Sequence, residues 1–135
     1  MKHLLLLFGL LISATIINAQ APQAFNYQAV VRDASGQIIT GQNVGVQISL
    51  LQGNASGEAI YTETHATATN AFGQINLAIG NGTVVTGQFD TIAWAADNYF
   101  VQLAVDITGG ANYEVVGASQ LLSVPYALHA EEGSG

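Results

Sequence analysis

A glutamate and a histidine stand two positions apart near the middle of the chain, at Glu63 and His65. Residues i and i+2 of a strand share one face, so the two side chains would be neighbours. A carboxylate beside an imidazole can orient a general base. Catalysis would also need a nucleophile, and the sequence holds no Gly-x-Ser-x-Gly turn. We therefore interpret the pair as solvated neighbours on a strand rather than as a catalytic centre.

Four aspartates are candidate calcium ligands, because they stand in or beside expected turns: Asp33, Asp90, Asp97 and Asp106. Calcium binds six to eight oxygens, often in such loops. However, no two aspartates alternate along the chain as a calcium loop requires. Turn formation by the Asp side chains is therefore the favoured interpretation, with structural calcium as the alternative. His3 belongs to the expected leader, so His65 and His129 are the only histidines that remain, and with no cysteine they are too few for a zinc site; no cofactor is therefore expected.

Aromatic side chains suggest either a packed plug or a surface that binds sugars. The set comprises Tyr61, Trp94, Tyr99, Phe100 and Tyr113. Packing at one end of the fold is favoured, because Trp94 follows Ile92 in an expected helical turn. The alternative is a carbohydrate-binding module, in which Trp94, Tyr99, Tyr61 and Tyr113 are the candidate glycan contacts.

One threonine is a candidate site of covalent modification. The triplet Asp90-Thr91-Ile92 resembles the Asp-Ser/Thr-apolar pattern of one bacterial O-glycosylation system. Thr91 is the residue that would carry the glycan. Asp90 also has a second interpretation, as the cap of the helical turn.

Composition excludes several functional classes. The 135 residues contain two Lys+Arg against nine Asp+Glu, with a formal net charge of -7. Two basic residues cannot neutralise a row of phosphates, which excludes nucleic-acid binding. The chain has no cysteine, so disulfides, thiol catalysis and thiolate metal sites are absent. The length is sufficient for one domain.

Alternation of apolar and polar residues predicts an all-β fold. Strands are expected over residues 25–32, 44–51, 58–69, 75–79, 99–107 and 117–124. Turn residues separate them, and one short helical turn is expected over 90–95. Many short strands at this spacing favour an antiparallel sandwich of the Ig-like or prealbumin-like kind.

The same alternation predicts which side chains form the core. One apolar layer between two sheets is expected to contain Val46, Ile48, Leu77, Val101, Leu103 and Val105. Gln47 and Gln102 should point the other way. Leu121 is expected to point inward from the last strand, together with Val116.

The N-terminus has the features of a cleaved export signal. A basic start at Lys2 precedes an apolar run over residues 4–17 and a small residue, Ala19. The run is too short to span a bilayer. We expect residues 1–19 to be removed, so that the protein is secreted, begins at Gln20 and has no transmembrane segment. Residues 20–124 would then form the sandwich.

The C-terminus is expected to lead away from the sandwich. Residues 126–132 favour a short helix after Pro125, and Gly133-Ser134-Gly135 suits a linker. Seven or eight residues are too few for a stable isolated helix. We therefore predict that residues 125–135 connect the module to a further region.

Two sequence patterns resemble known extracellular modules. Residues 29–36, 41–44 and 67–73 resemble the strand-and-turn rhythm of prealbumin-like and Cna-B-like domains. Residues 25–32, 69–73, 92–94, 99–100 and 119–128 resemble the N-terminal module of secreted bacterial surface proteins. Larger members of that second family often carry tail-fibre-like or collagen-like regions downstream. The resemblance implies a non-enzymatic extracellular structural or adhesion module, either displayed on the outer cell surface or released. Its partners would be that downstream region, glycans or other surface proteins.

Overall fold

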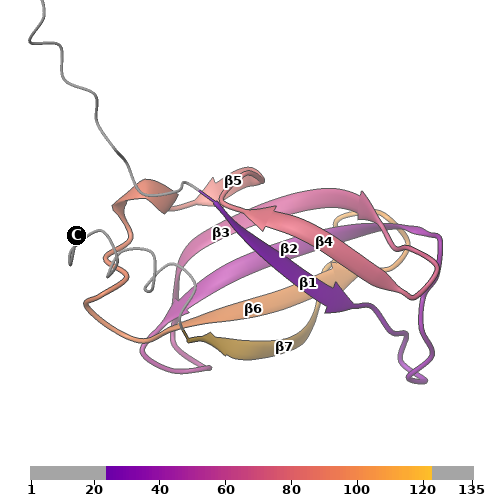
Figure 1. The fold of residues 1–135 in the computed structure, drawn as a ribbon, viewed down its shortest axis with the longest axis horizontal. Helices are drawn as coiled ribbons and strands as arrows, with labels where there is room; N and C mark the ends of the chain where they lie inside the picture. Colours follow the sequence, from indigo (N-terminus) through magenta and orange to yellow (C-terminus); the bar gives the residue numbers. More distant parts are fainter. Residues whose placement is uncertain (1–23, 123–135) are drawn as a thin grey trace, which may run out of the picture.

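Two antiparallel sheets make up the part of the chain that the computed structural model describes, residues 24–122 (Figure 1). The smaller sheet pairs β1 (Phe25–Val30) with β4 (Gln74–Ile79). The larger has the order β5-β3-β2-β6-β7. Its strands are β2 (Asn43–Gln52), β3 (Glu58–Ala68), β5 (Thr83–Thr86), β6 (Tyr99–Asp106) and β7 (Glu114–Leu121). The predicted all-β class is confirmed, and the arrangement is sandwich-like.

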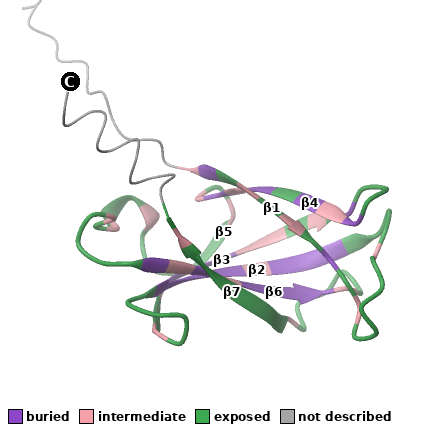
Figure 2. Ribbon diagram, turned by 60° about the horizontal axis from the view of Figure 1, so that its bottom comes forward, coloured by how far each residue is buried: buried purple, intermediate pink, exposed green. Residues whose placement is uncertain are grey.

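The core lies between the two sheets, as the alternation predicted. All six expected core residues are buried and belong to one hydrophobic cluster, which also contains Phe25, Ile75 and Ile79 from the smaller sheet. Figure 2 shows the buried residues running along β2 and β6. Gln47 and Gln102 are only half-buried, consistent with the opposite face. Period-two alternation therefore identified the layer that holds the sheets together.

Strand number and strand bounds differ from the sequence-based expectation. A seventh strand, β5, was missed, although its sequence Thr-Val-Val-Thr is rich in β-branched residues. The last strand begins at Glu114 and not at residue 117, because it pairs with β6 from Val105 onward. Val116 was expected inside but is 59% exposed, and its neighbour Val115 is 63% exposed, because β7 is an edge strand that is exposed on both faces over almost its whole length. Leu121 is half-buried against the core, as expected.

The helical turn is shorter than predicted and starts one residue earlier. A 3-10 helix spans Phe89–Thr91, with Gln88 as its N-cap. Asp90 lies inside the first turn, so its predicted role as the cap is wrong. Phe89 instead anchors the turn by packing against the core.

The two ends of the chain fall outside the described residues. The expected leader (1–19) and the expected helix and linker (125–135) therefore stay predictions. Within residues 24–122 the structure contains no helix long and apolar enough to cross a membrane.

Candidate functional site

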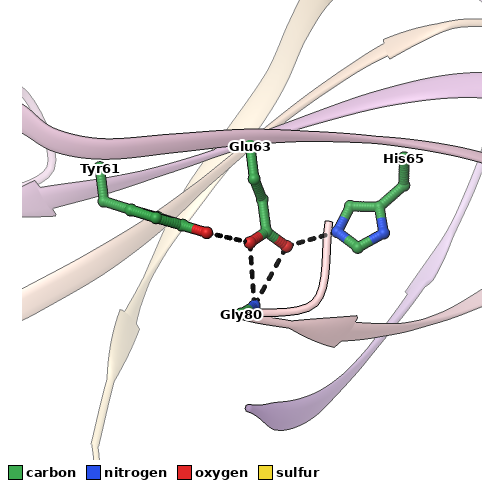
Figure 3. Close-up of polar contacts among 4 residues, drawn as sticks. All are labelled: Tyr61, Glu63, His65 and Gly80. Atoms are coloured by element: carbon green, nitrogen blue, oxygen red, sulfur yellow. Dashed lines mark hydrogen bonds and ion pairs between the residues drawn. The ribbon is translucent and has the colours of Figure 1, made fainter. Parts of the chain in front are cut away.

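Glu63 on β3 is the only fully buried acidic side chain among the described residues, and three groups surround its carboxylate (Figure 3). The Tyr61 hydroxyl donates to Oε1 at 2.5 Å. The backbone N–H of Gly80, which follows β4, donates to the two carboxylate oxygens at 2.9 and 3.2 Å. The Nε2 atom of His65 contacts Oε2. Because Tyr61, Glu63 and His65 alternate on one strand, the pleat places them in a row.

The turn between β4 and β5 covers this carboxylate. A Cβ atom added at Gly82 would lie 2.6 Å from His65 Nε2 and 2.9 Å from Glu63 Cδ. Any larger residue at Gly82 would therefore collide with the cluster. The expectation that Glu63 and His65 are solvated is wrong: the Glu63 side chain has 0% exposure and that of His65 has 13%. The turn residues exclude water that a strand face would otherwise meet.

Burial, the hydrogen bond to Glu63 and the charge of Glu63 raise the pKa of Tyr61 well above its usual value of 10.0. The phenol therefore stays protonated and acts as a hydrogen-bond donor. The donors from Tyr61 and Gly80 occupy the carboxylate from two sides. A carboxylate held in this way joins β3 to the end of β4 and has little freedom to act as a base on a ligand.

An aromatic cluster closes the end of the fold next to Tyr61. Trp94 lies at its centre, with ring centroids 6.0 Å from Phe25, 5.7 Å from Phe89 and 5.3 Å from Tyr99. Tyr61 joins through Phe89 at 5.4 Å. These centroid distances are typical of packed aromatic pairs. The favoured interpretation of a packed plug is therefore correct for these residues.

The four candidate glycan contacts do not form one platform. Tyr61 and Tyr99 are buried, and the Tyr99 hydroxyl donates to the Ala93 carbonyl at 2.9 Å. Burial also raises the pKa of Tyr99. Trp94 is half-buried in the cluster, while Tyr113 packs beside Gly45 at the other end of β2. The four rings therefore do not share one platform, because they pack at opposite ends of the sheet, and glycan contact by these residues stays an untested alternative.

Three of the four candidate aspartates bond to nearby backbone. Asp33 Oδ1 accepts the N–H groups of Ser35 and Gln37, both at 2.9 Å. Asp97 accepts the N–H of Asn98 at 2.7 Å. These contacts are turn formation by Asp side chains, the interpretation that the sequence favoured. In residues 24–122, no three or more His, Cys, Asp or Glu side chains are placed to hold a metal ion.

Asp106 organises the loop that joins β6 to β7. Its carboxylate accepts the Thr108 hydroxyl at 2.6 Å, the Thr108 N–H at 2.9 Å and the Asn112 N–H at 2.9 Å. These hydrogen bonds, that of the Thr108 side chain most of all, hold the pKa of Asp106 below its usual value of 3.8. The loop forms one wall of an open groove that Arg32 and Asp33 line from the other side.

Thr91, the candidate modification site, lies on the exposed face of the 3-10 turn. Its hydroxyl donates to the Gln88 carbonyl at 3.0 Å. The Thr91 side chain is thus accessible, although its hydroxyl group donates its hydrogen bond within the turn.

The first strand begins and the last strand ends at the same end of the molecule (Figure 1). Phe25, the first residue of β1, packs against Trp94, and Trp94 packs against Tyr99. Tyr99 in turn pairs with Leu121, the last residue of β7. The chain therefore begins and finishes its described fold at one end of the molecule, and the loops around Asp33, Asn70 and Thr108 lie at the other.

One family of protein domains matches residues 26–118, and its description is "Domain of unknown function (DUF8740)". The chain belongs to this family. No curated protein and no solved structure matches the chain. The match begins in β1 and ends in β7, so it includes the Glu63 cluster and the aromatic residues Tyr61, Phe89, Trp94 and Tyr99.

Sequence reasoning missed the buried role of Glu63 in this DUF8740 domain. The alternation of Tyr61, Glu63 and His65 could have indicated this network, because it places a tyrosine on the same face as the carboxylate. The third partner, Gly80, contributes its backbone N–H, so its contact with Glu63 could not be predicted from residue types. Its N–H reaches Glu63 only because β4 packs on β3.

Proposed function

We propose that the chain is a non-enzymatic extracellular module of a secreted or surface protein, with the Ig-like or prealbumin-like sandwich that the sequence resemblance implies. Its role is structural or adhesive. It holds a downstream fibrous or repeat region, its main partner, outside the cell. The module is either attached to the outer surface or released.

The position of the two strand ends is the observation that carries this proposal. Phe25 and Leu121 lie at the same end, tied together through Trp94 and Tyr99. With the leader removed before Gln20, the mature chain would begin, and its expected C-terminal connection would start, at the same pole. The opposite pole, with the turns at Asp33 and Asn70, would then point away from the downstream region.

The way ionisable groups are used supports a structural role. The Glu63 carboxylate accepts the Gly80 N–H and so links β3 to the end of β4. The Asp33 carboxylate accepts a backbone N–H within its own turn, and that of Asp106 accepts one within the loop between β6 and β7. Functional sites in enzymes instead keep such groups poised toward a cleft. These carboxylates stabilise the fold.

The scarcity of basic residues suits exposure outside the cell. Lys2 belongs to the expected leader, so Arg32 is the one strong base of residues 20–135. Its guanidinium donates to the Gly36 carbonyl at 2.9 Å, and its backbone forms a bridge with Ile38. Trypsin-like proteases would therefore find a single site, placed in an ordered turn.

Surface display tests the proposal. The chain with its own leader is fused at Gly135 to a reporter, and intact cells are treated with an externally added protease. We expect the reporter outside the cell, either accessible on intact cells or recovered from the medium. A reporter protected inside the cell would contradict the proposal. Saturable glycan binding by the purified chain would instead favour the carbohydrate-binding alternative.

A further inference from the structure

The turn between β4 and β5 contains the one Asn-Gly pair of the sequence, Asn81-Gly82. Asparagine is a chemically labile residue, because its side-chain amide can react with the backbone nitrogen of the next residue. A glycine in that next position has no Cβ atom to hinder the approach. Asn81 is exposed, so water reaches the reacting groups.

The hydrogen bonds around this turn leave both reacting groups free. The side-chain amide of Asn81 forms no hydrogen bond with any of residues 24–122, and only its backbone N–H is engaged, donating to the Ala78 carbonyl at 3.1 Å. The Gly82 nitrogen would be the nucleophile, and its N–H has no acceptor in the same range. The two groups therefore meet without first breaking a hydrogen bond within the protein.

Two other asparagines in turns are held by hydrogen bonds and are not followed by glycine. Asn70 Oδ1 accepts the N–H groups of Phe72 and Gln74 at 2.8 and 2.9 Å, and its Nδ2 donates to Gln74 Oε1 at 3.2 Å. Asn54 Oδ1 accepts the Ser56 N–H at 2.8 Å. An alanine follows each of them. These contacts and the alanine Cβ atoms distinguish both residues from the asparagine of the β4–β5 turn.

We propose that Asn81 is a site of spontaneous deamidation, and that the product loosens the turn that covers Glu63. The Gly82 nitrogen attacks Cγ of Asn81 and closes a five-membered imide, while the Cγ–Nδ2 bond breaks and ammonia leaves with the proton of the Gly82 N–H. Water then opens the imide. Cleavage between the nitrogen and Cγ gives aspartate, and cleavage between the nitrogen and the backbone carbonyl carbon gives isoaspartate, in which Cβ and Cγ belong to the main chain.

The place of this turn in the fold connects the reaction to the Glu63 cluster. Gly80 donates its N–H to the Glu63 carboxylate, and Gly82 packs so closely that an added Cβ would lie 2.6 Å from His65 Nε2. Isoaspartate lengthens the main chain between these two contacts by one atom, so the turn must rearrange. Either product also adds a negative charge to the turn above a buried carboxylate. The proposal rests on this geometry and does not depend on the proposed function.

Incubation of the purified chain in neutral buffer, followed by proteolysis and mass spectrometry, tests the site. Deamidation replaces an amide by an acid and so changes the mass of the fragment, and an isoaspartate-specific methyltransferase labels the isoaspartate product. We expect Asn81 to react at least about tenfold faster than Asn70, which corresponds to a barrier difference of about 1.4 kcal/mol. Asn81→Gln keeps an amide but needs a larger ring, so it should abolish the reaction at this position.

A matched variant separates the effect of the structure from that of the sequence. Ala71→Gly places a glycine after Asn70 at an exposed position and leaves the hydrogen bonds of the Asn70 side chain in place. Asn70 of this variant should still react more slowly than Asn81. Equal rates at the two positions would overturn the assignment, as would the absence of isoaspartate at Asn81.

Urea denaturation of the aged chain tests the effect on the cluster. Asn81→Asp adds the charge without lengthening the main chain, and Asn81→Gln adds neither. The isoaspartate product should unfold at a lower urea concentration than Asn81→Asp, and Asn81→Asp at a lower concentration than Asn81→Gln. An isoaspartate product that is as stable as Asn81→Gln would overturn the proposed loosening of the turn.

Discussion

The carboxylate of Glu63, on β3 of the larger sheet, accepts the backbone N–H of Gly80 at the end of β4 in the smaller sheet. This polar link crosses between two sheets that share one hydrophobic core. The Tyr61 hydroxyl and the His65 ring meet the same carboxylate, so the link is part of a buried network. Such a network stabilises one arrangement of the two sheets as long as each polar group keeps its partner.

Glu63→Ala should destabilise the fold by about 3–5 kcal/mol, because it leaves the Tyr61 hydroxyl and the Gly80 N–H without an acceptor. Urea denaturation measures the free energy of unfolding. Glu58→Ala is the control, since Glu58 is exposed on the same strand and its loss should cost no more than about 0.5 kcal/mol. Equal losses in the two variants would mean that the buried network contributes nothing.

Ile48→Ala should cost about 2–4 kcal/mol, because Ile48 is fully buried between the sheets and its truncation leaves a cavity. Gln47→Ala, one position away on the other face of β2, should cost much less. The same denaturation experiment compares them. A larger loss for Gln47→Ala would show that the strand faces the opposite way.

Asp106→Asn should loosen the loop between β6 and β7. The carboxylate accepts bonds from Thr108 and Asn112, and these lower its pKa below 3.8. A lowered pKa means that the stabilisation is complete above pH 3.8 and is lost as the pH falls through the lower, folded-state pKa. Hydrogen exchange at the Thr108 and Asn112 amides should therefore be faster in Asp106→Asn at neutral pH. Asp97→Asn is the control and should leave both amides unchanged.

Alkaline pH should unfold the protein through Tyr61 and Tyr99, which are buried, and Tyr27, which is half-buried. Burial raises the pKa of Tyr27, Tyr61 and Tyr99 above 10.0. The stabilisation from a raised pKa is complete below the unfolded value of 10.0 and is lost as the pH rises beyond it. Absorbance of tyrosinate and circular dichroism should therefore change together above that pH. Ionisation of these three side chains with unchanged circular dichroism would contradict their burial.

The sequence predicted the all-β class and the core layer because both depend on local alternation, as Ile48 and Val101 illustrate. It failed where a position depends on contacts from distant residues. Val116 continues the apolar pattern, but it lies on the edge strand β7, which is exposed on both faces. Glu63 looks like a surface residue by type, yet the turn at Gly82 covers it. Residue type alone could not predict that Trp94 and Tyr113 lie far apart. Their positions at opposite ends of the sheet follow from the pairing of β6 with β2.

The mass of the protein recovered from outside the cell tests most directly that this chain is an exported module. Residues 1–19 combine a basic start, an apolar run and Ala19, which together predict cleavage before Gln20. We expect an intact mass that corresponds to a chain beginning at Gln20, or to its pyroglutamate form. A protein that stays with the cells and retains residues 1–19 would contradict export and, with it, the extracellular role.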